Sequence, residues 1–293
     1  MEISALIRRY PWLTHVNSVE EYLTPEYYKQ LLRPYTFKGD SDLQLLENFL
    51  KSKHASSILE LGCGSGRASD VVVRINPDAI FTFSDLSERM LGTAKEHLPS
   101  RSTFVISDAI KFMEETSEQY DLIYTLWSFS HSTHQHIHRL GTEKAKHYIS
   151  LVIKKFIKEN IKPGGSFFLI HFDSLSDEQR ILMSQWGRIF PAFANIEQQS
   201  PSKQIIDHVL LDLDNDDKIN LSIDHMRGDP IVYATENDML ETFMNFHLET
   251  YFNTSPVVAE ILEDIRSQAE KYRNTDGSYS ISPGCYVYSF IKK

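Results

Sequence analysis

A short apolar stretch followed by three alternating glycines constrains this chain more than any other feature. Residues 58–61 read Ile-Leu-Glu-Leu and predict a buried parallel strand. Gly62, Gly64 and Gly66 follow, and a chain that turns from a strand directly into a helix needs the positive φ that glycine tolerates. The N–H groups of a helix beginning near Arg67 would point at any ligand held by this turn. The sequence therefore predicts an α/β fold with a nucleotide-type binding turn.

The spacing of the glycines distinguishes between two kinds of binding turn. The dinucleotide fingerprint G-x-G-x-x-G would place its third glycine at position 67, which is Arg67. The observed order, beginning at Glu60, is E-x-G-x-G-x-G, which resembles motif I of class I S-adenosylmethionine (SAM)-dependent methyltransferases. The resemblance implies that Glu60 holds the methionine end of the cofactor. A glycine-rich loop without a ligand is the alternative, so the rest of the chain has to decide.

Two further acidic residues follow predicted strands. Residues 79–84 read as a strand that ends on Asp85, 23 positions after the first motif glycine (85 − 62 = 23). This is close to the ~20 positions expected for a carboxylate that binds both ribose hydroxyls. Residues 103–107 form the next predicted strand, which is followed by Asp108. Because the carboxyl ends of parallel strands meet at one edge of an open sheet, we expect Glu60, Asp85 and Asp108 to lie at the ligand-binding edge.

Later segments resemble the remainder of the same fold. Residues 120–126 read as the fourth strand, and residues 161–165, Ile-Lys-Pro-Gly-Gly, resemble the family's tight turn before a fifth strand at 166–171. Residues 219–223 predict a sixth strand, and residues 285–291 predict the last one. The resemblance implies a seven-stranded, mostly parallel Rossmann-like sheet with helices on both faces and an antiparallel last strand.

The resemblance also implies which residues contact SAM. Asp85 begins an Asp-x-Ser-x-x-Met arrangement that places Met90 on the adenine ring, and Asp108 would lie beside the adenine amino group. The expected cofactor contacts are Glu60, Gly62, Cys63, Gly64, Gly66, Asp85, Leu86, Met90, Asp108, Ala109, Leu126 and Trp127.

Two histidines are candidates for a general base. Methyl transfer from a sulfonium is an in-line displacement, and a base is needed only when the acceptor arrives protonated. His131 follows the fourth strand and His171 ends the fifth, and histidine can accept a proton near neutral pH. The alternative is that both are ordinary polar residues at strand ends.

Four histidines lie close together after the fourth strand. They are His131, His134, His136 and His138. A helix would place His134 and His138 on one face. A zinc site needs three or four ligands, and neither a cysteine pair nor an H-E-x-x-H motif lies nearby, so we expect no metal site.

Aromatic residues supply candidate substrate contacts. Tyr27 and Tyr28 lie on a predicted helix before the first strand, Tyr35 comes shortly after it, and Phe129 follows the fourth strand. Their rings could form the wall of a pocket for a cation or an aromatic substrate. Aromatic residues on a helix are more often part of a hydrophobic core, so both interpretations stay open.

The length of 293 residues allows one large α/β domain or two small ones. We expect a single methyltransferase domain over residues 1–293. Its expected segments are an N-terminal helical lid (1–55), a SAM-binding core (56–173), a capping or substrate segment with the sixth strand (174–283) and the last strand (284–293). Within the third segment, helical patterns cover residues 177–190, 203–213, 237–252 and 256–272.

Charge and composition limit the partners. The net charge is −10 and no long run of Lys or Arg exists, which argues against binding to bulk nucleic acid. Cys63 and Cys285 have no metal-type spacing and suit a reducing compartment. With neither a signal peptide nor an apolar run of about 18 residues, we expect a cytoplasmic protein without membrane partners. Nothing in the sequence predicts the oligomeric state.

We therefore predict a SAM-dependent methyltransferase that acts on nitrogen or oxygen of a small-molecule acceptor. Residues 126–129 read Leu-Trp-Ser-Phe, so neither the N-P-P-Y motif of amino-methylating DNA enzymes nor the Pro-Cys of cytosine-C5 enzymes is present there. Two alternatives stay open. The chain could transfer or cyclise the aminocarboxypropyl arm of SAM, or it could bind SAM as a scaffold protein without catalysis.

Overall fold

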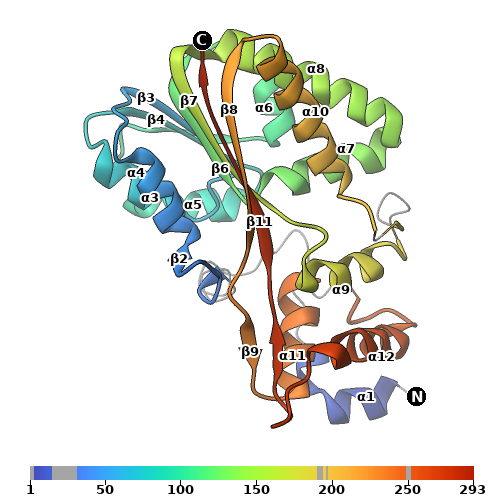
Figure 1. Ribbon diagram of the computed structural model, residues 1–293. Coiled ribbons are helices and arrows are strands. Elements are labelled where there is room, and N and C mark those ends of the chain that lie inside the picture. The colour runs from blue at the N-terminus through green and yellow to red at the C-terminus, as the bar shows by residue number, and fades with distance from the viewer. Residues whose placement is uncertain (1–2, 15–31, 190–193, 196, 249–251) are drawn as a thin grey trace. The chain divides into compact units, whose positions relative to one another are not determined.

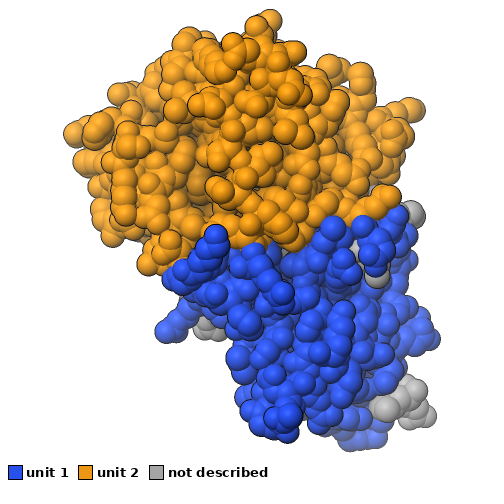
Figure 2. Space-filling model, viewed as in Figure 1, with its two compact units in different colours: residues 1–39, 174–197, 227–284 blue, residues 40–173, 198–226, 285–293 orange. Residues whose placement is uncertain are grey.

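The computed structural model describes residues 3–14, 32–189, 194–195, 197–248 and 252–293 (Figure 1). The chain divides into two compact units, which Figure 2 shows in different colours. Unit 1 comprises residues 1–39, 174–197 and 227–284, and unit 2 comprises residues 40–173, 198–226 and 285–293. This division differs from the predicted segments, because residues 40–55 belong with the sheet and the expected capping segment is shared between the units.

The described residues of unit 2 build a seven-stranded sheet in the order β5-β4-β3-β6-β7-β11-β8. The strands are β3 Ser57–Leu61, β4 Ile80–Asp85, β5 Thr103–Ile106, β6 Tyr120–Leu126, β7 Ile161–Phe172, β8 Ile219–Arg227 and β11 Gly284–Lys292. The strands from β3 to β7 pair in parallel, whereas β11 runs antiparallel to β7. The predicted fold class is thereby confirmed.

Helices pack on the sheet in two groups (Figure 1). One group contains α3 Asp42–Leu50 and α4 Arg67–Ile75, and the other contains α6 Ala109–Glu115, α7 Phe129–Leu140, α8 Thr142–Asn160 and α10 Pro201–Asn215. Helix α5 Glu88–His97 connects β4 to β5, and the short strand β2 Asp40–Ser41 precedes α3. Polar side chains fix several helix starts: Ser41, Ser87 and Asp108 each accept a hydrogen bond from the backbone N–H three residues later.

The Pro-Gly-Gly segment is part of β7 rather than a separate turn. Tyr120 pairs with Ile161, but the next pair joins Leu122 to Ser166, so the intervening residues bulge out of register. A side chain at Gly165 would place its Cβ 2.8 Å from the Lys162 carbonyl oxygen, which explains why glycine stands there.

Unit 1 is mainly helical. Its elements are α1 Ile3–Arg9, a 3₁₀ helix Pro11–Thr14, β1 Thr36–Phe37, α9 Asp177–Trp186, β9 Ile231–Tyr233, α11 Glu236–Thr242, a π-helix Phe243–His247, α12 Val258–Ala269, a 3₁₀ helix Glu270–Tyr272 and β10 Tyr279–Ile281. Strands β9 and β10 pair antiparallel. The helix expected over 237–252 therefore changes to a π-helix after Thr242.

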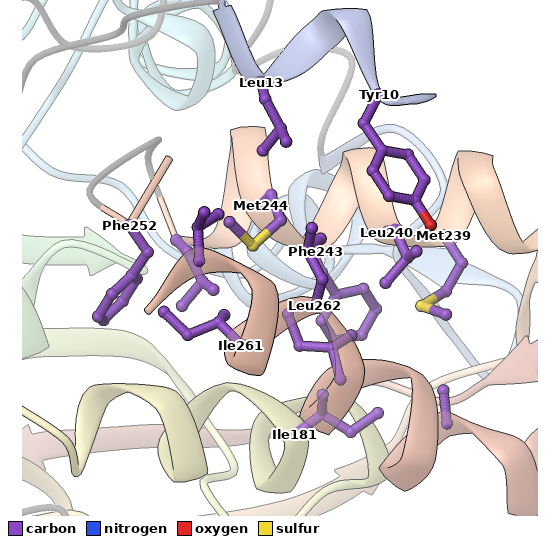
Figure 3. Packing of buried hydrophobic residues seen from close by; sticks show 14 of the residues in the cluster. Tyr10, Leu13, Ile181, Met239, Leu240, Phe243, Met244, Phe252, Ile261 and Leu262 are labelled. Carbon is purple, nitrogen blue, oxygen red and sulfur yellow. The ribbon is translucent and has the colours of Figure 1, made fainter. Parts of the chain in front are cut away.

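Unit 1 has its own hydrophobic core. Met239, Leu240, Phe243 and Met244 belong to one cluster with Leu13 of the first 3₁₀ helix and with apolar residues of α9 and α12, as Figure 3 shows. None of the helices in the described part of the chain is long and apolar enough to cross a lipid bilayer.

Candidate functional site

The glycine turn between β3 and α4 adopts the conformation that its sequence predicts. Gly62, Gly64 and Gly66 have φ angles of 74°, 54° and 90°, all in the left-handed region that favours glycine. The N–H groups of Gly62 and Cys63 both donate to the Ser84 carbonyl oxygen, at 2.8 and 2.9 Å, which ties the turn to the end of β4. Helix α4 begins directly after Gly66, so its first N–H groups lie at this turn.

Gly62 also allows a close approach of the corner that follows β6. A Cβ built at Gly62 would lie 2.2 Å from the Ser128 hydroxyl oxygen, so no larger residue fits. The Ser128 hydroxyl donates to the Leu61 carbonyl oxygen at 2.9 Å. The corner after β6 is thus fastened to the glycine turn.

Asp85 lies against the same turn. Its carboxylate accepts the N–H of Gly64 at 2.7 Å and the N–H of Ser87 at 2.8 Å. Burial raises the pKa of Asp85, and these backbone hydrogen bonds oppose that rise. A carboxylate has about four lone-pair directions, so both oxygens retain acceptor capacity for hydroxyl groups.

Glu60 points into the interior instead of toward the surface of the turn. It is 2 % exposed, and its carboxyl accepts hydrogen bonds from the hydroxyls of Ser69 and Tyr124. Burial raises the pKa of Glu60 to about 7, although both hydroxyls lower it. Glu60 therefore connects β3 to α4 and β6, and its contact with the methionine end of a cofactor stays a prediction.

Asp108 is bound by the neighbouring helices. It caps α6 by accepting the N–H of Lys111 at 3.0 Å, and it also bonds with Ser132 and with Nε2 of His136, the latter at 3.0 Å. Burial raises the pKa of Asp108, but the hydrogen bonds of Ser132 and His136 outweigh burial and hold the pKa below its usual range. Asp108 thus has α7 partners that the sequence did not predict.

The remaining predicted cofactor residues differ in exposure. Met90 is buried, and its Cε lies 3.8 Å from the position of a Cβ on Gly64, so it borders the turn, while its contact with adenine stays a prediction. Leu86 is 48 % exposed at the end of β4. The other predicted contacts are buried, namely Cys63, Ala109 and Leu126.

Trp127 has the left-handed backbone conformation, with φ 64°, which is unusual for a bulky residue. Its backbone N–H donates to the Ile170 carbonyl oxygen at 3.0 Å, and its indole Nε1 donates to a carboxylate oxygen of Asp42 at 2.7 Å. Asp42 also pairs with the guanidinium of Arg67. No sequence pattern indicates this contact between residues 42 and 127, because the two residues are distant in the chain.

His131 lies in the first turn of α7 and is partly buried. Its Nε2 is 3.0 Å from the side-chain nitrogen of Gln135, and because an amide NH₂ donates, Nε2 accepts. Burial lowers the pKa of His131, and nearby Asp108 opposes this shift. A histidine that is neutral at pH 7 can accept a proton, provided that Gln135 releases the lone pair.

His171 is fully enclosed, with 1 % of its surface exposed. Its Nδ1 is 2.7 Å from the Phe172 carbonyl oxygen and must donate, so Nε2 accepts from the Ser202 hydroxyl at 2.9 Å. Burial lowers the pKa of His171 to about 4. Both ring nitrogens are therefore engaged between β7 and α10, an arrangement that favours the structural interpretation over the catalytic one.

The other histidines of α7 occupy different environments. His136 is bound to Asp108, whereas His138 is exposed. Burial, together with His171 and His131, holds the pKa of His134 well below its usual value. Among the described residues, no three metal-binding side chains come close enough to hold an ion.

Those predicted substrate residues that the structure describes are buried and do not line an exposed surface. Tyr27 and Tyr28 lie outside the described residues. Tyr35 is buried in unit 1, where its hydroxyl is 2.7 and 2.8 Å from the two carboxyl oxygens of Glu178. Phe129 is buried at the start of α7.

Comparisons with known proteins match the part of the chain that carries this site. Residues 58–148 match the family model of a methyltransferase domain. Malonyl-[acyl-carrier protein] O-methyltransferase of Priestia megaterium is 33% identical over 129 residues, which cover 44% of this chain and 40% of that protein. Trans-aconitate 2-methyltransferase of Paracidovorax citrulli is 36% identical over 70 residues, which cover 24% of this chain and 26% of that protein. The chain thus spans less than half the length of these curated relatives.

Among solved structures, the chain is similar to the YcgJ protein from Bacillus subtilis. The TM-score is 0.51 at 11% sequence identity, and the match covers 86% of this chain and 97% of that one. At this identity the likeness concerns the fold alone.

Proposed function

We propose that this chain transfers a methyl group from SAM to nitrogen or oxygen of a small-molecule acceptor. It carries a methyltransferase domain, and its glycine motif resembles that of the class I, SAM-dependent family. The observation that carries the proposal is the turn after β3. Three left-handed glycines lie there at the start of α4, and the carboxylate of Asp85 binds the N–H of Gly64.

The residues of this edge fit the parts of SAM. The first N–H groups of α4 would receive the carboxylate of the amino-acid end, and the glycines of the turn, which lack side chains, would leave room for it. Asp85 would bind the ribose hydroxyls with its remaining acceptor capacity, and Met90 would lie on the adenine ring. SAM, when bound, supplies an electrophilic methyl group for in-line displacement, and the chain aligns and shields the reactants.

The nature of the acceptor decides whether a base is required. The two curated relatives described above are named for malonyl-[acyl-carrier protein] O-methylation and trans-aconitate methylation. An acceptor that arrives as an anion attacks without proton transfer, whereas an ammonium or a hydroxyl must lose a proton. For a protonated acceptor we assign this step to His131, because burial keeps its imidazole neutral at pH 7.

Calorimetry with SAM and S-adenosylhomocysteine (SAH) tests the proposal. We expect one site per chain for each ligand, and a folded chain that binds neither would refute the proposal. A screen of small-molecule acceptors, monitored by SAH release, then tests the reaction. Formation of methylthioadenosine instead of SAH would indicate transfer of the aminocarboxypropyl arm, and binding without turnover of any acceptor would favour a scaffold protein.

Asp85→Ala tests the ribose contact. Removing a charged acceptor of two hydroxyls should weaken SAM binding by about 1–3 kcal/mol. Asp78→Ala is the matched control, because Asp78 is an exposed carboxylate just before the same strand. Equal affinities of the Asp85→Ala variant and the unchanged chain would mean that the ribose is held elsewhere.

A further inference from the structure

We propose that Asp42 is a positioning residue. Its carboxylate binds both Trp127 and Arg67 at the sheet edge where the cofactor would lie, so that cofactor affinity depends on this carboxylate. The inference rests on the proposed function, since it concerns the same site. Asp42 lies at the start of α3, well before the glycine motif in the sequence, and all three residues belong to unit 2.

The carboxylate of Asp42 is saturated with donors. One oxygen accepts from Trp127 Nε1 at 2.7 Å and from Arg67 Nη2. The other oxygen accepts from Arg67 Nη1 at 3.0 Å and from the N–H of Leu43 at 2.9 Å. Because Asp42 is 1 % exposed and its lone-pair directions are taken, it acts on other residues and does not bind a ligand itself.

The two partners of Asp42 stand at the two segments that a cofactor would contact. Arg67 is the first residue of α4 and directly follows the last glycine of the turn. Trp127 is the residue after β6, and its left-handed φ persists only if its surroundings hold it. The bonds from the Trp127 indole and the Arg67 guanidinium to one carboxylate supply that restraint.

Asn cannot replace this carboxylate. Each oxygen of Asp42 faces at least two donors, so an amide NH₂ in either place would meet N–H groups. The substitution would also leave the guanidinium of Arg67, whose side chain is 18% exposed, without its countercharge. Both effects release Trp127 and the start of α4.

The test compares Asp42→Asn with Glu47→Gln by SAH calorimetry. Glu47 is the matched control, because it also lies on α3 and pairs with α4 through Arg74, but this pair is exposed. We expect Asp42→Asn to raise the Kd for SAH about tenfold or more at one site per chain. Glu47→Gln should change the Kd less than about twofold.

The stoichiometry separates positioning from simple destabilisation. An irreversibly misfolded fraction lowers the number of sites per chain and leaves the Kd unchanged, whereas reversible unfolding raises the apparent Kd by the reciprocal of the folded fraction. Urea denaturation of Asp42→Asn measures this folded fraction, and a rise in the Kd no larger than its reciprocal would also overturn the inference. An unchanged Kd with reduced stoichiometry, or an unchanged Kd and stoichiometry, would overturn the inference while the proposed function stands. If the unchanged chain itself does not bind SAH, the proposed function fails and the inference fails with it.

Trp127→Phe keeps the inference testable if Asp42→Asn does not fold. This variant removes the indole N–H and leaves the pair of Asp42 and Arg67 intact. We expect a rise in the Kd for SAH of about three- to tenfold. Where both variants fold, the double variant should bind no more weakly than Asp42→Asn alone, and additive losses would contradict a shared mechanism.

Discussion

At the scale of single residues, Gly62 is the position where both backbone and space demand glycine. Gly62→Ala would force a φ of 74° on a residue with a side chain and would place its Cβ 2.2 Å from the Ser128 hydroxyl. We expect the free energy of unfolding to fall by about 1–3 kcal/mol. We also expect SAH binding to weaken by at least about tenfold, as measured by urea denaturation and calorimetry.

Gly92→Ala provides the control for this glycine. Gly92 lies inside α5, and a Cβ there would meet no atom within 4 Å. Alanine should stabilise the helix by about 0.5–1 kcal/mol and leave SAH binding unchanged. If both variants behaved alike, the special conformation of Gly62 would have no functional consequence.

The pH dependence of turnover tests His131. Burial places the pKa of His131 below its ordinary value of 6.5, so the imidazole is neutral at pH 7. As a base, it would make kcat fall when the pH drops through this lowered pKa, and the acidic limb should therefore lie below pH 6.5. His131→Ala should lower kcat by about 10²–10⁴-fold with little change in SAM affinity.

His131→Asn separates proton transfer from positioning. Asn retains hydrogen bonding and comparable size but does not titrate. A variant with nearly normal kcat and the same acidic limb would contradict the assignment as base. A raised KM with preserved kcat would instead indicate that His131 shapes the pocket.

Local sequence patterns predicted residues whose chemistry depends on their neighbours in the chain. The glycine turn and the acid at the end of β4 both follow from spacing. Asp42 was not predicted as a site residue, because its partner Trp127 comes from a distant segment. Likewise, no sequence pattern indicates that the Ser202 hydroxyl forms a hydrogen bond with His171.

At the scale of elements, the parallel strands were predicted well. The regions predicted for β3 to β6 agree with the structure within a few residues, because each is a short apolar run next to a turn signal. The predicted resemblance to methyltransferases is confirmed by the match of residues 58–148 to a methyltransferase domain. Strands β9 and β10 were missed, since three-residue strands far apart in sequence carry no detectable period.

The hydrogen bond between His171 on β7 and Ser202 on α10 leads to a prediction that the free energy of unfolding falls at acid pH. His171 has a pKa of about 4 in the fold and an ordinary value of 6.5, so unfolding takes up a proton between these values. Its neutral form stabilises the fold fully above pH 6.5, and this contribution is lost as the pH falls. We expect about 2 kcal/mol less stability from this residue at pH 5 than at pH 8.

Urea denaturation of the unchanged chain and of His171→Asn at both pH values measures this contribution. The variant should lose about 2 kcal/mol less between pH 8 and pH 5, because its amide does not titrate. His171 also helps to lower the pKa of His134, so the difference between the two chains reports the titration of His171 together with this coupling. Parallel losses would show that His171 has the same pKa in the folded and unfolded chain.

At the scale of the whole molecule, the chain leaves the sheet and returns to it. The sequence predicts one capping or substrate segment over residues 174–283 that includes the sixth strand, and β8 does join the sheet. The structure adds that residues 198–226, with α10, belong to unit 2 as well. Periodicity predicts the helix α10, but it does not tell which core this helix joins, because both units offer apolar partners. The assignment of each segment depends on contacts between residues far apart in the chain.

The two separate cores lead to a final prediction about the response to ligand. A ligand slows amide exchange only for openings that disrupt its site, so SAH at about 100 times its Kd should slow those openings by about 100-fold. We expect this protection in residues 57–90, which contain the glycine turn and Asp85. Helix α12, Val258–Ala269, should exchange at an unchanged rate, because it packs in the core of unit 1. Hydrogen exchange with mass spectrometry measures both regions in one experiment, and equal slowing in α12 would show that the two units unfold together.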